Sequence, residues 1–195
     1  VLGREDSIEI SCSSTPVSAD TAIDILCRSE ATIRDLQEVY QAVSSRCPSN
    51  YLTAGMIVDE DLWAVIYTLS TGGAPFPGLK DVLDCLKDLG ADVYVASGDS
   101  RRSLAYLQDL GFDLERVYSV SSPKRKAEIV MDLKKNYRRV VMIGDGLNDI
   151  YALRAADVGV LTLQQDTRPP PQLLSAADLV IRNINELPEI VRRLS

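Results

Sequence analysis

Short apolar runs alternate with amphipathic segments over the C-terminal part of the chain, and one strand–helix–strand pattern is clearest. Residues 139–143 end in four consecutive apolar residues, mostly β-branched, and the run stops at Gly144, which is typical of a buried strand. Residues 147–156 carry apolar side chains at three- and four-residue steps together with several alanines, which predicts a helix. A second apolar strand is expected over 158–163.

The same alternation extends from Gly78 to the C-terminus. Strands that alternate with helices of this length favour right-handed crossovers and a mostly parallel sheet. We therefore expect an α/β fold, a doubly wound core of Rossmann type. The other helices are expected over 79–89, 100–110, 123–135, near 173 and from 187 onward, and the other strands over 92–96, 117–120 and 179–181.

Residues 1–74 have a different pattern of apolar and polar residues, which predicts a smaller α+β domain. A weak strand is expected over 7–11, followed by helices over 18–29 and 32–46, the second of which is amphipathic. Two β-rich runs, 51–58 and 62–69, flank Asp59-Glu60-Asp61 and predict a hairpin. The glycine- and proline-rich loop 71–78 is expected to join this domain to a core domain over 75–195.

Composition narrows the class of protein. The 195 residues are 46% hydrophobic and 25% charged, as in ordinary globular proteins, and no apolar run approaches the roughly 20 residues that span a bilayer. The net charge of −7 argues against nucleic-acid binding, which needs a basic face. No C-x-x-C pair occurs, so the cysteines are interpreted as reduced, mostly buried thiols of a cytoplasmic protein. They are Cys12, Cys27, Cys47 and Cys85.

Two carboxylates are expected to face one cleft. Asp145 follows the strand 139–143, and Asp149 lies in the first turn of the next helix. Ligands bind at the carboxyl ends of strands in open α/β sheets, so this pair predicts a cation site. Mg²⁺ is favoured over zinc because its ligands are oxygens and the chain has no histidine. Alternatively, both carboxylates only stabilise a helix N-terminus, by about 0.3–1 kcal/mol.

Two other stretches suggest phosphate chemistry. Ser97-Gly98-Asp99 follows a predicted strand and offers a hydroxyl and backbone N–H groups to an anion, although a plain helix cap formed by Asp99 or Ser100 would explain the same residues. The segment 123–130, P-K-R-K-A-E-I-V, places three bases at a helix start, where cations oppose the helix dipole. A solvated helix face is the simpler interpretation of that run.

Three of these stretches together resemble motifs of the haloacid dehalogenase-like (HAD) superfamily, in the branch that includes the phosphorylation domain of P-type ATPases. G-D-G-L-N-D followed by A-L-R-A-A-D-V-G-V resembles the fourth motif, S-G-D the second and P-K-R-K-A-E-I-V the third. The resemblance implies that Ser97 and the Gly98 amide bind a phosphoryl group and that Lys126 holds the nucleophile and the phosphoryl charge together.

The resemblance further implies that Asp145 binds Mg²⁺ directly, and that Asp149 either binds the ion too or orients a water bound to it. Gly144, Gly146 and Asn148 would shape the loop between them.

The first HAD motif, an aspartate nucleophile in a D-x-D or D-x-x-G-T setting, has no good match before Ser97. Asp59-Glu60-Asp61 follows an apolar run but lacks the G-T, so a hairpin tip is favoured over a displaced nucleophile. The segment from Glu9 to Gly73 resembles the cap and connecting region of soluble, archaeal-type P-type-ATPase-like HAD proteins. That resemblance implies that the nucleophile strand precedes Val1 and is absent from this chain. A start at Val1 rather than Met is expected of a fragment, of a processed chain or of a chain with a disordered start.

The expected function is a Mg²⁺-dependent phosphohydrolase that acts on a phosphorylated small molecule through an aspartyl phosphate. A core without its central strand would leave two rows of backbone groups open and an apolar gap between them. We expect an N-terminal segment or a second chain to fill it; direct pairing of the strands that end near Ser97 and Asp145 would contradict this. The alternatives are a non-catalytic metal- or phosphate-binding or regulatory subunit and, less favoured, a phosphotransferase or a phosphonatase-like hydrolase.

Overall fold

The computed structural model describes residues 10, 13–46, 52–99, 101, 103–165 and 168–194, and the chain forms two compact units, Val1–Pro75 and Phe76–Ser195. Among the described helices, none is long and apolar enough to cross a membrane. Of the strand expected over 7–11, only Ile10 falls within the described residues.

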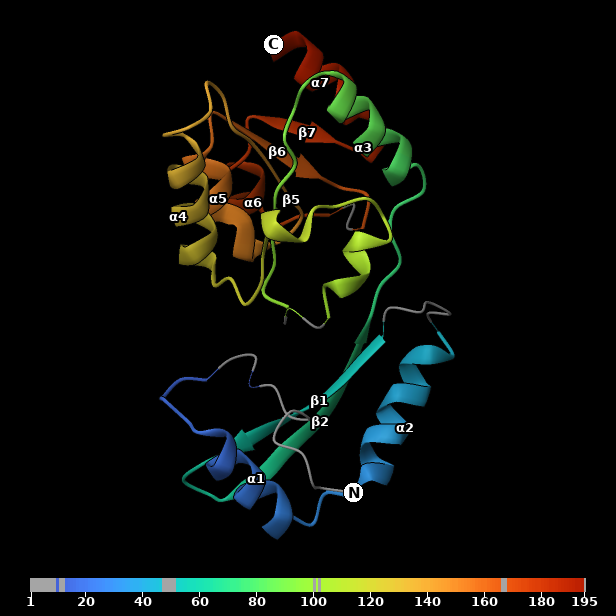
Figure 1. Cartoon of the computed structure of the whole chain (residues 1–195), viewed down its shortest axis with the longest axis vertical. Helices are drawn as coiled ribbons and strands as arrows, with labels where there is room; N and C mark the ends of the chain where they lie inside the picture. The colour runs from blue at the N-terminus through green and yellow to red at the C-terminus, as the bar shows by residue number, and fades with distance from the viewer. Residues whose placement is uncertain are drawn as a thin grey trace. The chain divides into compact units, whose positions relative to one another are not determined.

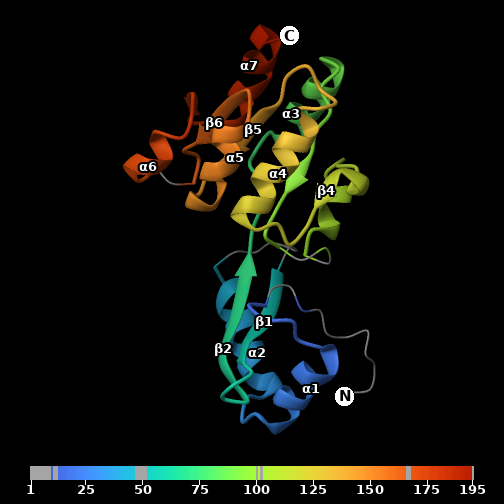
Figure 2. The ribbon, with the colours of Figure 1, turned by 90° about the vertical axis from the view of Figure 1, so that its left-hand side faces the viewer.

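The first unit is built on an antiparallel hairpin of β1 (Leu52–Asp59) and β2 (Ala64–Gly72), against which α1 (Ala19–Arg28) and α2 (Ile33–Ser44) pack (Figure 2). Asp59 ends β1, and its carboxylate accepts a hydrogen bond of 3.0 Å from the Leu62 amide across the tip. The hairpin prediction is therefore confirmed, and the Asp59 side chain stabilises the turn.

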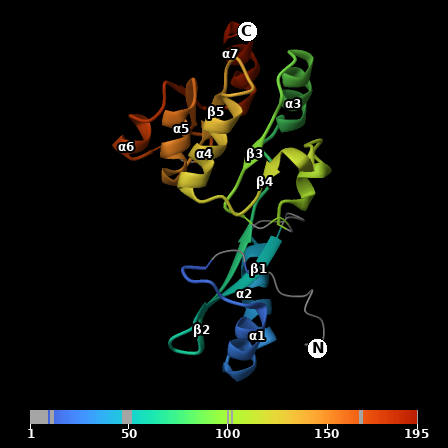
Figure 3. The same ribbon diagram turned by 60° about the vertical axis from the view of Figure 1, so that its left-hand side comes forward.

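The second unit contains two separate parallel sheets (Figures 1 and 3). One pairs β3 (Val95–Ala96) with β4 (Val117–Tyr118), and the other has the order β5 (Val141–Gly144), β6 (Val158–Thr162), β7 (Leu179–Ile181). Figure 1 shows α4 (Pro123–Leu133) and α5 (Ile150–Ala155) on one side of the second sheet, with α3 (Leu79–Asp88) and α7 (Leu187–Leu194) on the other. The short helix α6 (Pro171–Leu174) completes the unit.

Two apolar clusters hold this unit together. Leu153 of α5 packs with Leu161 of β6 and with residues around α6, while Val82 and Leu86 of α3 pack with Ile184 and Leu187 near α7. Parallel sheets are buried on both faces, which is why β6 is almost entirely apolar and why helices cover both of its sides.

A cavity of about 890 Å³ separates the two sheets. It is lined by every residue from Ala91 to Ser97 on the β3 side and from Arg138 to Asp145 on the β5 side. In the described part of the chain β3 pairs with β4 alone and β5 with β6 alone, so each keeps an open edge. We call the part of the cavity between residues 91–97 and 138–145 the slot.

The structure corrects several local predictions. The helix expected over 100–110 is wrong as a continuous element, because the described residues there form turns and a 3₁₀ helix at Ala105–Gln108. The helix expected from 147 begins as a 3₁₀ turn, Leu147–Asp149, and β3 is shorter than the predicted 92–96. Cys85 is half-buried, but Cys27 is an exposed thiol, and Cys12 and Cys47 lie outside the described residues.

Candidate functional site

The lining of the cavity includes the charged and hydroxyl groups singled out in the sequence. Ser97, Lys126, Asp145 and Asp149 all line it, although they come from four separate segments of the chain, and Gly144 lies beside them. Ser97 and Asp145 directly follow β3 and β5, at the carboxyl ends where ligands bind in α/β sheets.

Lys126 lies in the first turns of α4. Ser122 caps this helix by accepting a hydrogen bond of 3.2 Å from the Arg125 amide, and Pro123 occupies the first helical position, where its missing N–H costs nothing. The Lys126 ammonium donates a hydrogen bond of 2.8 Å to Oδ1 of Asp149, and both side chains are buried. A lysine at a helix start thus gains a buried counter-charge that offsets the unfavourable helix dipole.

Asp149 is fully engaged within the loop that follows β5. Its second oxygen, Oδ2, accepts hydrogen bonds of 3.2 Å from the backbone amides of Asp145 and Gly146. A Cβ atom added at Gly144 would lie 2.6 Å from the Cβ of Asp149, so only glycine allows this close approach. Glycine is therefore required at position 144, because it leaves room for the Asp149 side chain to pack against the end of β5.

Asp145 differs from Asp149 in being exposed. With the described residues, its carboxylate makes no hydrogen bond or ion pair, whereas its amide is held by Asp149. Asp145 is thus a positioned carboxylate with both oxygens free to take a cation, while Asp149 is held by Lys126 and the backbone.

The loop of Ser97, Gly98 and Asp99 is fixed by the segment after β4. Ser97 O accepts a hydrogen bond of 2.7 Å from the Ser121 amide, and Asp99 O accepts one of 2.8 Å from the Val120 amide. The Ser97 hydroxyl donates to the Asp99 carboxylate at 2.7 Å and accepts from the Asp99 amide at 3.1 Å. To bind an anion, this hydroxyl would have to turn away from Asp99.

Val120 has a positive φ of 49°, which is unusual for a β-branched residue. Its strained backbone directs its N–H to Asp99, and the next residue, Ser121, is buried. Sequence reasoning missed both residues, as well as Thr162, a buried hydroxyl of β6 that also lines the cavity. Nothing in the local pattern of residues 119–122 predicts a left-handed valine.

Three of the predicted site residues lie outside the cavity lining. Gly98 and Asn148 are exposed, and Gly146 contributes its amide to Asp149 rather than a surface to the cavity. The sequence also predicted an anion-binding site at a helix start after Asp99. In the described residues no regular helix begins there.

The donor chemistry at this end fits Mg²⁺ in part. In the described part of the chain, no group of three or more Asp, Glu, Cys or His side chains converges as a complete metal site. Mg²⁺ usually takes only one or two protein carboxylates and completes its shell with water and substrate oxygens, so the free Asp145 carboxylate is a suitable ligand. Asp149 would support it indirectly, through the Asp145 amide.

Comparison with known proteins identifies the family of this chain. A family model described as haloacid dehalogenase-like hydrolase matches residues 26–157. The chain is 29% identical over 194 residues to the soluble P-type ATPase-like phosphatase of Methanocaldococcus jannaschii, covering 99% of this chain and 70% of that protein. It is 35% identical over 82 residues to the probable copper-importing P-type ATPase A of Enterococcus hirae, covering 42% of this chain and 11% of that protein.

Solved structures give the same result. The catalytic domain of the CPx-ATPase CopB-B matches with a TM-score of 0.56 and 30% identity, over 66% of this chain and 51% of that one. A zinc-transporting PIB-type ATPase, with a TM-score of 0.56 and 20% identity over 80% of this chain and 24% of that one, supports the fold alone. Because the family model spans well over half of its residues, this chain belongs to the haloacid dehalogenase-like hydrolases.

Proposed function

We propose that this chain forms the core and cap of a Mg²⁺-dependent phosphohydrolase that works through an aspartyl phosphate. The observation that carries the proposal is that Ser97, Lys126 and Asp145 line one cavity, with Lys126 buried against Asp149. A hydroxyl, an ammonium and a free carboxylate are the groups that would bind a phosphoryl group and a hard cation together.

The nucleophile in this proposal is an aspartate on a strand that precedes Val1. Its carboxylate oxygen attacks phosphorus, the bond from phosphorus to the leaving oxygen breaks, and that oxygen takes a proton from a second carboxyl group, since the chain has no histidine. Water then attacks the same phosphorus, the bond to the aspartate oxygen breaks, and inorganic phosphate leaves.

The residues of this chain have separate tasks. Lys126 offsets the negative charge of the phosphoryl oxygens, and Asp149 fixes the ammonium in place. Ser97 and the Gly98 amide orient the phosphoryl group, after the Ser97 hydroxyl leaves Asp99. When bound through Asp145, Mg²⁺ supplies further positive charge to the phosphoryl oxygens.

The substrate is proposed to be a phosphorylated small molecule, and residues 1–74 are proposed to act as the cap that closes over it and excludes water. The cytoplasm is the proposed location. The soluble phosphatase of M. jannaschii is similar along almost the whole of this chain, which supports a phosphatase more than a transport function.

A non-catalytic binding role is the second candidate, and one observation favours it. Of the two described carboxylates that follow β5 and line the cavity, Asp149 is ion-paired with Lys126, and Asp145 is assigned to the cation. Without a supplied nucleophile, the site could bind Mg²⁺ and phosphate but not turn a substrate over.

An assay with para-nitrophenyl phosphate and Mg²⁺ separates the two functions. We expect the chain extended by its natural upstream polypeptide to release nitrophenol, the Asp145→Asn form of it to lose most of this activity, and Asp84→Asn, a change at an exposed position of α3, to keep it. If the extended chain binds Mg²⁺ but is as inactive as the 195-residue chain, the binding role is correct.

A further inference from the structure

We infer that Thr162 is a further positioning residue of the cation site, and that its hydroxyl donates a hydrogen bond to the Asp145 carboxylate when a divalent cation is bound there. This inference rests on the proposed function, which assigns Asp145 to the cation. Thr162 belongs to none of the three sequence motifs, the last of which ends at Val160. The role concerns the affinity of the site for the cation rather than the chemical step.

Thr162 ends β6 next to the place where β5 ends. The two strands are parallel, and their register pairs Gly144, the last residue of β5, with Leu161. Thr162 is the next residue of β6, and Asp145 is the next residue after β5. The register therefore brings Thr162 beside the carboxylate that is assigned to the cation.

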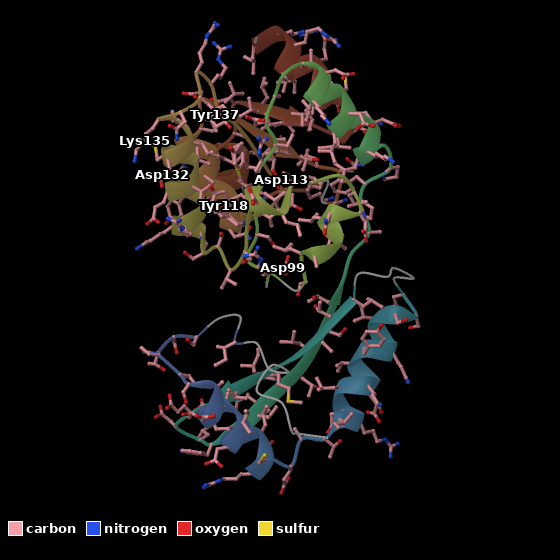
Figure 4. All side chains as sticks on the ribbon, in the orientation of Figure 1. Asp99, Asp113, Tyr118, Asp132, Lys135 and Tyr137 are labelled. Carbon is pink, nitrogen blue, oxygen red and sulfur yellow. The ribbon has the colours of Figure 1, made fainter. Side chains whose placement is uncertain are left out.

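The ends of these strands lie toward the loop that carries Ser97. At the opposite, amino ends, the hydroxyl of Tyr94, before β3, lies 2.7 Å from that of Tyr137, before β5. Figure 4 shows Tyr137 and Asp99, in the loop after β3, toward opposite ends of the unit. Because β6 is parallel to β5, Thr162 lies at the end that Asp99 marks.

Side-chain alternation puts Thr162 and Asp145 on the same face of the sheet. Leu161 belongs to the apolar cluster around α5 and α6, so its neighbour Thr162 faces the side of α3 and α7. Ile143 belongs to the cluster on that side, and Asp145 follows it by two residues. The cavity lining agrees with this, because Thr162 is the one residue of β6 that lines the cavity, together with Asp145.

The Thr162 hydroxyl accepts a hydrogen bond but keeps its proton available. Its Oγ1 accepts a long hydrogen bond of 3.4 Å from the Gln164 amide, and the residue is only 5% exposed. The Gln164 side chain in turn accepts 2.8 Å from the Ile184 amide, which holds the segment after β6. Among the residues that the structure describes, none accepts the Thr162 proton. A buried donor without an acceptor is unfavourable, so this proton favours an acceptor at the cavity.

Asp145 is the carboxylate that can take this proton. It is exposed and makes no side-chain hydrogen bond or ion pair with the described residues, so it can turn without breaking one. Asp149 is already held, since its oxygens accept from the Lys126 ammonium and from two backbone amides. A carboxylate that binds a metal is usually oriented by a further hydrogen bond. Thr162 would supply that bond, and its β-branched side chain has few rotamers to lose.

Two substitutions separate the hydroxyl from the shape of the side chain. Thr162→Val replaces the hydroxyl by a methyl group, whereas Thr162→Ser keeps the hydroxyl and removes the methyl group. Thr68→Val, in β2 of the other unit, is the matched control. Each change is made in the chain extended by its natural upstream polypeptide. Binding of Mn²⁺, which also prefers oxygen ligands, is measured by electron paramagnetic resonance of the free ion, with Mg²⁺ as competitor.

We expect Thr162→Val to weaken the binding of both ions by about 10- to 100-fold, and Thr162→Ser by less than about threefold. Thr68→Val should change neither affinity. A residue that acts through Asp145 should lose its effect when that carboxylate is removed. Adding Thr162→Val to Asp145→Ala should therefore weaken Mn²⁺ binding no further, whereas a general disturbance of the fold would weaken it again.

Unchanged affinity in Thr162→Val, an equal loss in Thr162→Ser, or a full further loss in the Asp145→Ala background would overturn the inference. The proposed function fails separately. If Thr162→Val loses affinity as expected but the unsubstituted extended chain does not hydrolyse para-nitrophenyl phosphate with Mg²⁺, the hydroxyl has the inferred role and the catalytic proposal is wrong. If that chain hydrolyses the ester and Thr162→Val binds both ions normally, the reverse holds. No Mn²⁺ binding by the unsubstituted chain would contradict both.

Discussion

The ammonium of Lys126 lies 2.8 Å from Oδ1 of Asp149, and the two side chains are only 7% and 6% exposed. Each charge is buried because the other is present, and the backbone amides of Asp145 and Gly146 satisfy the remaining carboxylate oxygen. The pair links α4 to the loop after β5, so it joins the third and fourth sequence motifs in one physical unit.

Lys126→Met should destabilise the chain by about 3–5 kcal/mol, because it leaves the Asp149 carboxylate buried without a counter-charge. Urea denaturation measures this loss. Adding Asp149→Asn should recover part of it, since Asn keeps an acceptor for the backbone amides and removes the charge. Lys135→Met, at a solvent-exposed pair with Asp132, is the matched control and should cost less than about 1 kcal/mol. Equal losses for Lys126→Met and Lys135→Met would show that burial of the pair has no energetic effect.

Gly144→Ala should disturb the site more than Gly146→Ala. The added methyl group would lie 2.6 Å from the Cβ of Asp149 in the first case, and near the adaptable end of the Asn148 side chain in the second. We expect a loss of about 1–3 kcal/mol for Gly144→Ala, in the range of overpacked cores, and weaker Mg²⁺ binding by calorimetry. If Gly146→Ala is the more damaging change, the close approach of Asp149 to the strand end is not what requires glycine.

Val120→Asn should stabilise the chain by about 1 kcal/mol, because asparagine tolerates the left-handed conformation that Val120 adopts at φ 49°. The amide that holds Asp99 is kept. Thermal unfolding measures the effect, with Val117→Asn in β4 as the destabilising control. A lower Tm for Val120→Asn would mean that the valine side chain contributes more than its backbone strain costs.

The stability of the chain should depend on Asp157 at acid pH. Hydrogen bonds from the Lys134 ammonium and the Val140 amide lower the pKa of Asp157 below its ordinary value of 3.8. A carboxylate with a lowered folded-state pKa stabilises the fold above pH 3.8 and loses that contribution as pH falls through the folded value. Asp157→Asn should therefore flatten the acid limb of the free energy of unfolding against pH, and Lys134→Met should remove part of the same slope. An unchanged acid limb in both variants would contradict the assignment.

Local signals in the sequence predicted local structure well. Ser122 and Pro123 mark the start of α4, the Asp59 turn marks the hairpin, and the apolar run before Gly144 marks β5. In the described residues β3 and β5 belong to different sheets and are not paired with each other, and the expected occupant of the gap between them stays a prediction.

Other features depend on contacts between distant segments, which no local pattern encodes. The continuous helix expected over 100–110 is replaced in the described residues by turns and a short 3₁₀ helix, although its apolar spacing is helical. The Ser97 hydroxyl is held by Asp99, and the loop is held by Val120 and Ser121 from beyond β4. The ion pair of Lys126 with Asp149 joins residues 23 positions apart, so sequence alone could suggest both roles but not their contact.

Mass spectrometry of the trapped phosphoenzyme tests the central claim most directly. The chain extended by its natural upstream polypeptide would be incubated with a reactive phosphate ester and Mg²⁺, quenched in acid and digested. The proposed mechanism predicts a single hydroxylamine-sensitive phosphoryl group on an aspartate of the strand before Val1, which disappears in the Asp145→Asn variant. Hydrolysis without any covalent phosphate, or a phosphoryl group on Asp59 or Asp61 of the hairpin, would contradict it.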